Sequence, residues 1–81
     1  MVQVILTGSM RALAGGVEAV EVEASTFKEV LDALVVKYPS LKPQIDRGVS
    51  LAVDGLVYRN SWFTKVKPDS EVVLMPYMKG G

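Results

Sequence analysis

The chain has 81 residues, of which 49% are hydrophobic and 22% charged, and its nine basic and nine acidic side chains give a net charge of zero. This length predicts one small domain, and the neutral charge gives no electrostatic footprint for nucleic acid or an anionic membrane. Cysteine and histidine are absent, which excludes a thiolate nucleophile, a Ser-His couple and an ordinary zinc site, so we expect no metal.

The first two elements are predicted to form a β-hairpin. Residues 2–8 are rich in β-branched side chains and end on a glycine, which is typical of a strand. Residues 9–17 include two adjacent glycines and are expected to be a loop. Residues 18–24 alternate valine with glutamate, as a half-buried antiparallel strand does.

A helix is predicted next, from a capping box and an apolar stripe. Thr26 and Glu29 have the spacing at which each side chain accepts a hydrogen bond from a free backbone N–H of the first turn. Six apolar residues follow at helical spacing and predict one face packed on a core: Phe27, Val30, Leu31, Leu34, Val35 and Tyr38. Pro39 ends the helix, because proline disfavours the α conformation in the residue before it.

A second hairpin is predicted around Asp54 and Gly55, a strong two-residue turn signal between residues 49–53 and 56–59. Before it, residues 40–48 are expected to be a polar connection with at most one short turn. After it, residues 60–70 are expected to cross over irregularly, with Trp62 or Phe63 filling part of the core.

The last strand is predicted at residues 71–76, where side chains on both faces are apolar. Since side chains alternate along a strand, Val73, Met75 and Tyr77 are expected on the outer face. Two interpretations stay open for this row: a strand buried on both sides, or a patch that binds a partner.

The order hairpin, helix, hairpin, connection and strand predicts an α+β protein of the β-grasp (ubiquitin-like) type. We expect a mixed sheet of four to five strands with one main helix packed across it. Residues 1–76 would form this domain, and residues 77–81 a flexible tail beyond Pro76, which has no N–H to continue a ladder. A ferredoxin-like plait needs a second helix, for which residues 38–45 are too short and too rich in proline.

Several segments resemble the MoaD/ThiS family of ubiquitin-like sulfur carriers, and the molybdopterin synthase small subunit more than the thiamine carrier. They are "RALAGG" (11–16), "EVLDALVVKYPSL" (29–41), "VDG" (53–55) and "KPDSEVVLMP" (67–76). The chain also ends in Gly80 and Gly81, like the reactive terminus of the family. The resemblance covers nearly the whole length.

The resemblance implies chemistry at Gly81 carried out by other proteins. An adenylyltransferase of the ubiquitin-activating type would join the Gly81 carboxylate to ATP, and sulfur would replace the adenylate to give a thiocarboxylate. ATP would be used by that enzyme, and the chain itself would bind no cofactor. The sulfur would pass to the large subunit of molybdopterin synthase or an equivalent acceptor, with this chain as the small, non-catalytic subunit.

We expect partners to bind along the last strand and the tail. The candidate residues are Val73, Met75, Pro76, Tyr77, Met78 and Lys79, followed by Gly80 and Gly81 as the reacting end. Tyr77, Met78 and Lys79 replace the proline and small residues usual in these carriers, so we expect them to select the partner.

Three function classes are compatible with the sequence. The chain could be a sulfur carrier, for molybdopterin or for thiamine, cysteine or tRNA thiolation. It could be a protein modifier conjugated through Gly81, or a plain interaction module.

No apolar run is long enough to span a membrane and no basic leader opens the chain, so we expect a cytoplasmic protein, monomeric when free.

Overall fold

A computed structural model describes residues 1–59 and 61–76 of the chain. In chain order the elements are β1 (Val2–Leu6), α1 (Ser9–Leu13), β2 (Ala19–Val22), α2 (Phe27–Lys37), a 3-10 turn η1 (Pro39–Leu41), α3 (Lys42–Arg47), β3 (Val49–Val53), β4 (Leu56–Tyr58) and β5 (Glu71–Pro76). No helix in this described part is both long and apolar enough to cross a membrane.

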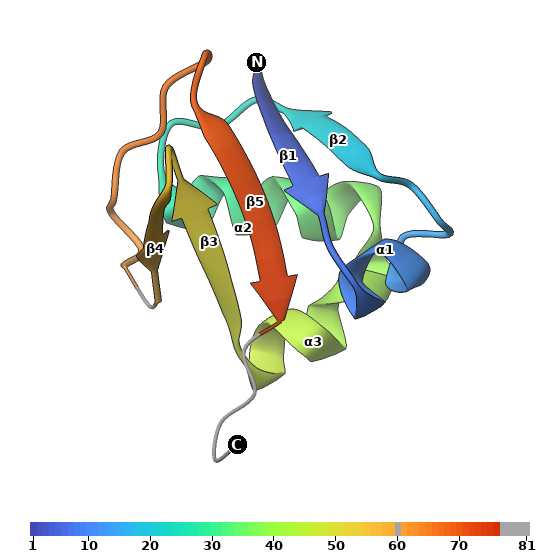
Figure 1. The fold of residues 1–81 in the computed structure, drawn as a ribbon. Helices are drawn as coiled ribbons and strands as arrows, with labels where there is room; N and C mark the ends of the chain where they lie inside the picture. Colours follow the sequence, from blue (N-terminus) through green and yellow to red (C-terminus); the bar gives the residue numbers. More distant parts are fainter. Residues whose placement is uncertain (60, 77–81) are drawn as a thin grey trace.

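The strands form one mixed sheet in the order β2-β1-β5-β3-β4. β5 lies between β1, to which it is parallel, and β3, to which it is antiparallel. The helix α2 crosses one face of this sheet, while α1 and α3 lie at the end toward which β1 and β5 run (Figure 1). This arrangement is the β-grasp fold that the sequence predicted.

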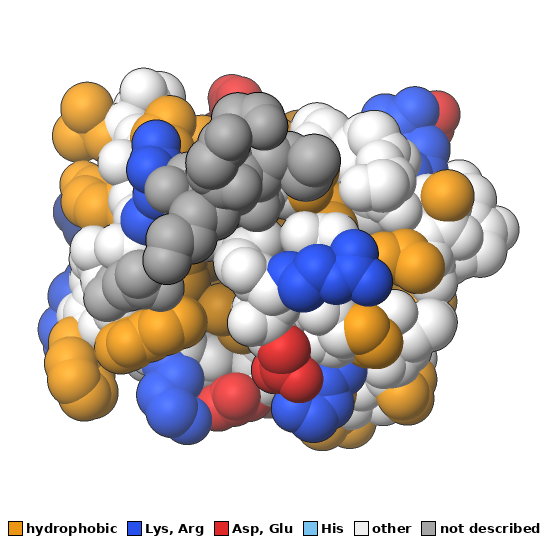
Figure 2. Space-filling view, turned by 90° about the horizontal axis from the view of Figure 1, so that it is seen from below, with side chains coloured by type: hydrophobic (Ala, Val, Ile, Leu, Met, Phe, Trp, Pro, Cys, Tyr) orange, Lys and Arg blue, Asp and Glu red, His pale blue; other side chains and the backbone are white. Residues whose placement is uncertain are grey.

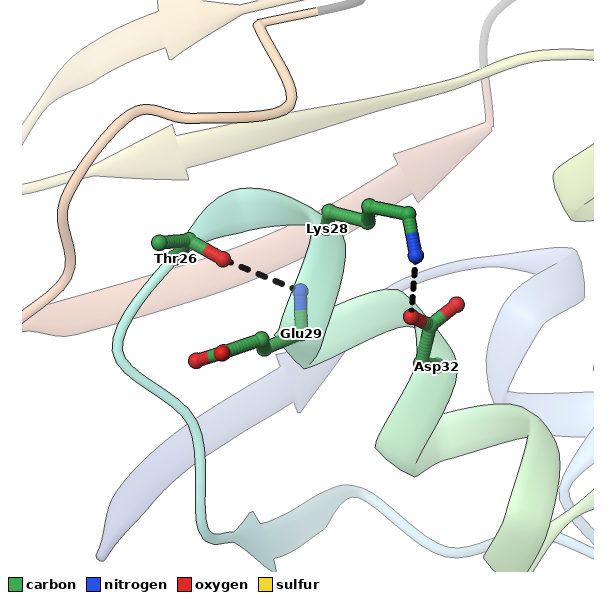
Figure 3. A network of polar contacts seen from close by, with 4 residues as sticks. All are labelled: Thr26, Lys28, Glu29 and Asp32. Carbon is green, nitrogen blue, oxygen red and sulfur yellow. Dashed lines mark hydrogen bonds and ion pairs between the residues drawn. The ribbon is translucent and has the colours of Figure 1, made fainter.

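The longest described helix, α2, begins where the sequence predicted. The Glu29 backbone N–H donates to Thr26 Oγ1 at 3.2 Å (Figure 3). The reciprocal half of the capping box is shifted by one residue: Glu29 Oε1 accepts from the backbone N–H and the hydroxyl of Ser25, each at 2.8 Å. These contacts satisfy donors that would otherwise be free at the helix start.

The predicted turn at Asp54 and Gly55 is confirmed. Both residues have positive φ angles, 51° and 88°, which is the backbone that a tight hairpin turn requires and that glycine adopts most easily. Val53 therefore pairs with Leu56, and Ala52 with Val57.

Two expected loops contain short helices, which corrects the sequence prediction. Residues 9–13 form α1, whose Met10 is fully buried, and Gly15 and Gly16 follow it with positive φ, where they end the helix. Residues 42–47 form α3, which tolerates Pro43 because proline within the first helical turn interrupts no helical hydrogen bond. Neither helix crosses the sheet, so the β-grasp assignment stands.

The core lies between the sheet and α2. It is made of side chains from every strand except β4, from the helices α1 and α2, and from connecting segments; its largest fully buried members are Phe27, Leu6, Met10, Leu34, Leu41, Leu51 and Leu74. Four of the six predicted apolar positions of α2 are buried, and Val35 and Tyr38 are half-buried.

The connection after β4 is held against the start of α2. The backbone N–H groups of Phe27 and Lys28 donate to the carbonyls of Thr64 and Trp62, at 2.8 and 2.9 Å. The rings of Trp62 and Phe27 also pack edge to face, with centroids 5.5 Å apart and an angle of 85° between the ring planes. Trp62 packs on the core residue Phe27 but is 41% exposed, and Phe63 is 82% exposed. The prediction that one of the two fills part of the core was therefore wrong, because both rings lie outside the start of α2; the apolar side chain of this connection that enters the core is Val66, which is 4% exposed.

Candidate functional site

The candidate site is built on β5, the strand that leads to the chain's last residues. β5 is the central strand of the sheet, with backbone ladders on both sides. Its final residue, Pro76, still pairs with Val49 of β3. The chain therefore leaves the sheet from a strand that is hydrogen-bonded to a neighbour on each side, which fixes the position of Pro76.

Contacts at both ends hold β5 in register. At its start, the Glu71 N–H donates to Asp54 Oδ1 and the Asp54 N–H donates to the Glu71 carbonyl, both at 2.9 Å. Near its end, the hydroxyl and the backbone N–H of Thr7 both donate to the Leu74 carbonyl, at 3.0 and 3.3 Å. These bonds leave β5 little freedom to slip along its neighbours.

The two faces of β5 differ as alternation predicts. Val72 and Leu74 are fully buried against the core, whereas Val73 and Met75 are half-buried on the outer face. By the same alternation Pro76 lies on the core side, opposite Val49. The expected partner-binding residues 73, 75 and 76 therefore do not share one surface: Pro76 faces away from the other two.

Val73 belongs to an apolar row that crosses the whole outer face of the sheet. The strand registers align one residue from each strand, which we call the outer row: Ala19, Ile5, Val73, Ala52 and Val57. Its members are half-buried or, at Val57, 59% exposed. None of the helices in residues 1–59 and 61–76 covers this face (Figure 1), so among the described residues the row is an apolar strip open to a partner.

Of this row, only Val73 was predicted from the sequence as a partner-binding residue. The pairing of Ala52 with Val57 follows from the two-residue turn at Asp54 and Gly55, so these two members of the row could have been predicted from the sequence. The alignment with Ile5 and Ala19 depends on the parallel pairing of β1 with β5, which joins segments about 70 residues apart and has no local signal.

The end of the sheet where β5 finishes is a mixed surface. Seen from that end, basic, acidic and hydrophobic side chains are interspersed (Figure 2). The remaining candidate residues, Tyr77, Met78, Lys79, Gly80 and Gly81, lie outside the described residues.

Residues 1–59 and 61–76 contain no cluster of acidic side chains placed to hold a metal ion.

Hydrogen bonds from the Ser25 backbone and hydroxyl lower the pKa of Glu29, and the hydrogen bond and charge of Asp32 raise the pKa of Lys28 (Figure 3). Both groups are exposed at the first turn of α2, on the face opposite the outer row, so their shifted pKa values reflect helix capping and ion pairing.

Comparison with known proteins gives a family and a fold. The model of the ThiS family matches residues 4–81, and no curated protein matches the chain in sequence. A structure of the BexX/CysO complex of Amycolatopsis orientalis contains a chain that superposes with a TM-score of 0.77 at 20% identity, over the full length of both chains.

The small archaeal modifier protein 1 of Methanosarcina acetivorans gives a TM-score of 0.79 at 23% identity, covering 99% of this chain and 95% of that one. The protein of the same name from Haloferax volcanii gives 0.71 at 24%, covering 99% and 98%. At these identities the likeness shows a shared β-grasp fold.

Proposed function

Because the chain belongs to the ThiS family, we propose that it is a ubiquitin-like sulfur carrier whose reacting group is the carboxylate of Gly81. The observation that carries this proposal is the extent of the family match, which reaches residue 81 and so includes Gly80 and Gly81. The described fold supports it, since a firmly held central strand leads directly to these residues.

The proposed chemistry has two steps, both in a partner's active site. The ionised Gly81 carboxylate attacks the α-phosphate of ATP, which forms the acyl-adenylate and releases pyrophosphate. Sulfide, as HS⁻, then attacks the acyl carbon and displaces AMP, and loss of the proton from sulfur leaves a terminal thiocarboxylate with no change of oxidation state. The chain supplies no acid or base; it supplies the carboxylate and a way to present it.

Glycine suits this role because it has no Cβ. The last two residues can adopt conformations closed to other residues and enter a narrow channel. A side chain on Gly81 would lie beside the reacting carbonyl and obstruct the incoming sulfur. Five extended residues span at most about 17 Å, so residues 77–81 are long enough to carry the carboxylate from the end of β5 into another protein.

The outer row is the proposed docking surface for the adenylyltransferase and for the protein that accepts the sulfur. It is apolar, and Val73 places it on the strand that leads to Gly81, with Met75 beside it on the same face. A partner seated there binds close to the exit point of the tail.

The proposed acceptor is the large subunit of molybdopterin synthase, with this chain as the small subunit. This finer assignment rests on the resemblance carried by the segments at 11–16, 29–41, 53–55 and 67–76, which is closer to the molybdopterin synthase small subunit than to the thiamine carrier. Thiamine, cysteine or tRNA thiolation would use the same chemistry with another acceptor.

A second function, protein modification through Gly81, is favoured by one observation. Two of the structural neighbours are named small archaeal modifier proteins. In that case the activated Gly81 carbonyl would form an amide with a lysine of a target instead of a thiocarboxylate. Conjugates of high mass that disappear when Gly80 and Gly81 are deleted would identify this function; free chain alone would argue against it.

Two adjacent residues of β4 give a matched test of the docking surface. Val57 lies in the outer row and is 59% exposed, while Leu56 points to the opposite face and is 64% exposed. In an ATP–pyrophosphate exchange assay with the adenylyltransferase, we expect Val57→Lys to raise KM about tenfold, the cost of losing one buried apolar side chain. Leu56→Lys should leave KM unchanged. Equal KM values for the two variants would refute docking on the outer row.

A further inference from the structure

The helix side of the molecule carries an apolar groove that the proposed function does not use. One part, of about 310 Å³, reaches from Trp62 and Phe63 to α2 and α3, and an adjoining part of about 410 Å³ continues along α2. Both parts include Leu31 and Ile45, so they form one helix-side groove, with apolar walls from Leu31, Val35, Val36, Ile45, Trp62 and Phe63.

Large apolar side chains are left exposed at both ends of this groove. Phe63 is 82% exposed at one end and Val36 is 81% exposed at the other. A contiguous apolar surface with such residues at its edges is typical of a protein interface.

Phe63 is exposed but its backbone is not free to move. The carbonyls on either side of it, of Trp62 and Thr64, accept hydrogen bonds from the first turn of α2, and the Trp62 ring packs on buried Phe27. Phe63 thus projects from a backbone that is fixed before any partner binds, so no backbone entropy is lost there on binding.

The charges around the groove are balanced. Two ion pairs border it, Lys28–Asp32 at 2.7 Å and Lys42–Asp46 at 3.1 Å. Because both signs lie along the groove, a second copy rotated by a half-turn can bring lysines of one copy opposite aspartates of the other. The net charge of the whole chain is zero, so no overall repulsion opposes such pairing.

In place of the monomer expected from the sequence, we infer that the helix-side groove is the interface of a twofold-symmetric dimer, in which Phe63 of each copy enters the groove of the other. The molecule measures 28 × 27 × 18 Å, so its broad face is large enough to bury roughly 600–800 Å² per copy, as stable interfaces do. The groove contains no strand residue. Pairing through it leaves the outer row of both copies free, so this inference does not depend on the proposed function.

Sedimentation equilibrium of the full chain, from about 10 µM to about 1 mM, tests the inference. We expect the apparent mass of the wild type to rise from 8.8 kDa toward twice that value. Phe63→Ser should weaken association about tenfold or more, as loss of a central aromatic anchor does, and Val36→Ser should weaken it as well. Val57→Ser, on the outer row, should associate like the wild type.

Thermal unfolding of each variant verifies that it is folded, which the exposure of the three side chains leads us to expect. A wild type that stays at 8.8 kDa at the highest concentration would overturn the inference and leave the groove to a partner of another sequence. Association that survives Phe63→Ser and Val36→Ser, or that is lost in Val57→Ser, would place the interface elsewhere and overturn it too.

Discussion

Replacing neighbouring residues of β5 by alanine tests the assignment of its two faces. Leu74 is fully buried against the core and pairs with Leu6 and Leu51, whereas Val73 is half-buried on the outer face. Leu74→Ala removes three fully buried carbon atoms, Cγ and the two Cδ methyls, and leaves a cavity, at a cost of about 3 kcal/mol. Val73→Ala removes two half-buried methyl groups and should cost about 1 kcal/mol.

These losses are large for a chain of this size. At 0.05–0.15 kcal/mol per residue, 81 residues give a total stability of roughly 4–12 kcal/mol. Leu74→Ala should therefore lower Tm by about 12–24 °C and Val73→Ala by about 4–8 °C.

Urea unfolding followed by circular dichroism measures both changes, with the slope m unchanged if only the folded state is affected. Tryptophan fluorescence of Trp62 gives a second probe on the far side of the core. Equal losses for the two variants, or a greater loss for Val73→Ala, would refute the assigned faces and with them the outer row.

Three further outcomes follow from the same structure and from the proposed chemistry. Gly81→Val should leave Tm unchanged and abolish adenylate formation in a pyrophosphate exchange assay; a variant that still forms adenylate would contradict the requirement for glycine. Thr26→Ala should cost about 1 kcal/mol in urea unfolding, because it removes the acceptor of the Glu29 N–H, and an unchanged midpoint would show that the cap is dispensable. The pKa of Glu29 is lowered from 4.5 in the folded state, so the ionised carboxylate stabilises the fold fully above pH 4.5, and this stabilisation disappears as the pH falls through the lowered pKa. Glu29→Gln should therefore be less stable than the wild type at pH 7 in urea unfolding, and the difference should shrink in acid. A difference in stability that does not change with pH would contradict a contribution from the Glu29 charge.

Local signals were sufficient to predict most of the fold. The helix α2 has both a cap and a six-residue stripe, and the second hairpin has a turn in which Asp54 and Gly55 adopt the required positive φ. The alternation in β5 gave the correct directions for Val73 and Met75. Each of these features is encoded within a few consecutive residues.

The short helices α1 and α3 were missed because their stability is not local. Helices of five or six residues do not form alone in water. α1 is held by burial of Met10, and α3 follows buried Leu41 and places Gln44, whose amide donates to the Gly48 carbonyl, in the interior. The surrounding structure provides those contacts.

The surfaces were missed for the same reason. The outer row requires the register of all five strands, including the parallel pair of β1 and β5. The helix-side groove requires residues 62–64 to be hydrogen-bonded to α2, more than 30 residues earlier in the chain. The sequence shows that Val57 and Phe63 are apolar, but only the tertiary structure shows which surface each belongs to.

The intact mass of the chain tests the central claim most directly. The purified chain, whose starting mass also establishes that it ends at Gly81, is incubated with an adenylyltransferase of the ubiquitin-activating type, ATP and a sulfur donor, with a second sample lacking the donor. The account predicts that only the complete mixture shifts the mass by the replacement of one oxygen by sulfur, and that a chain lacking Gly80 and Gly81 shows no shift. An unchanged mass for the full chain, under conditions in which its adenylate forms, would contradict a sulfur carrier.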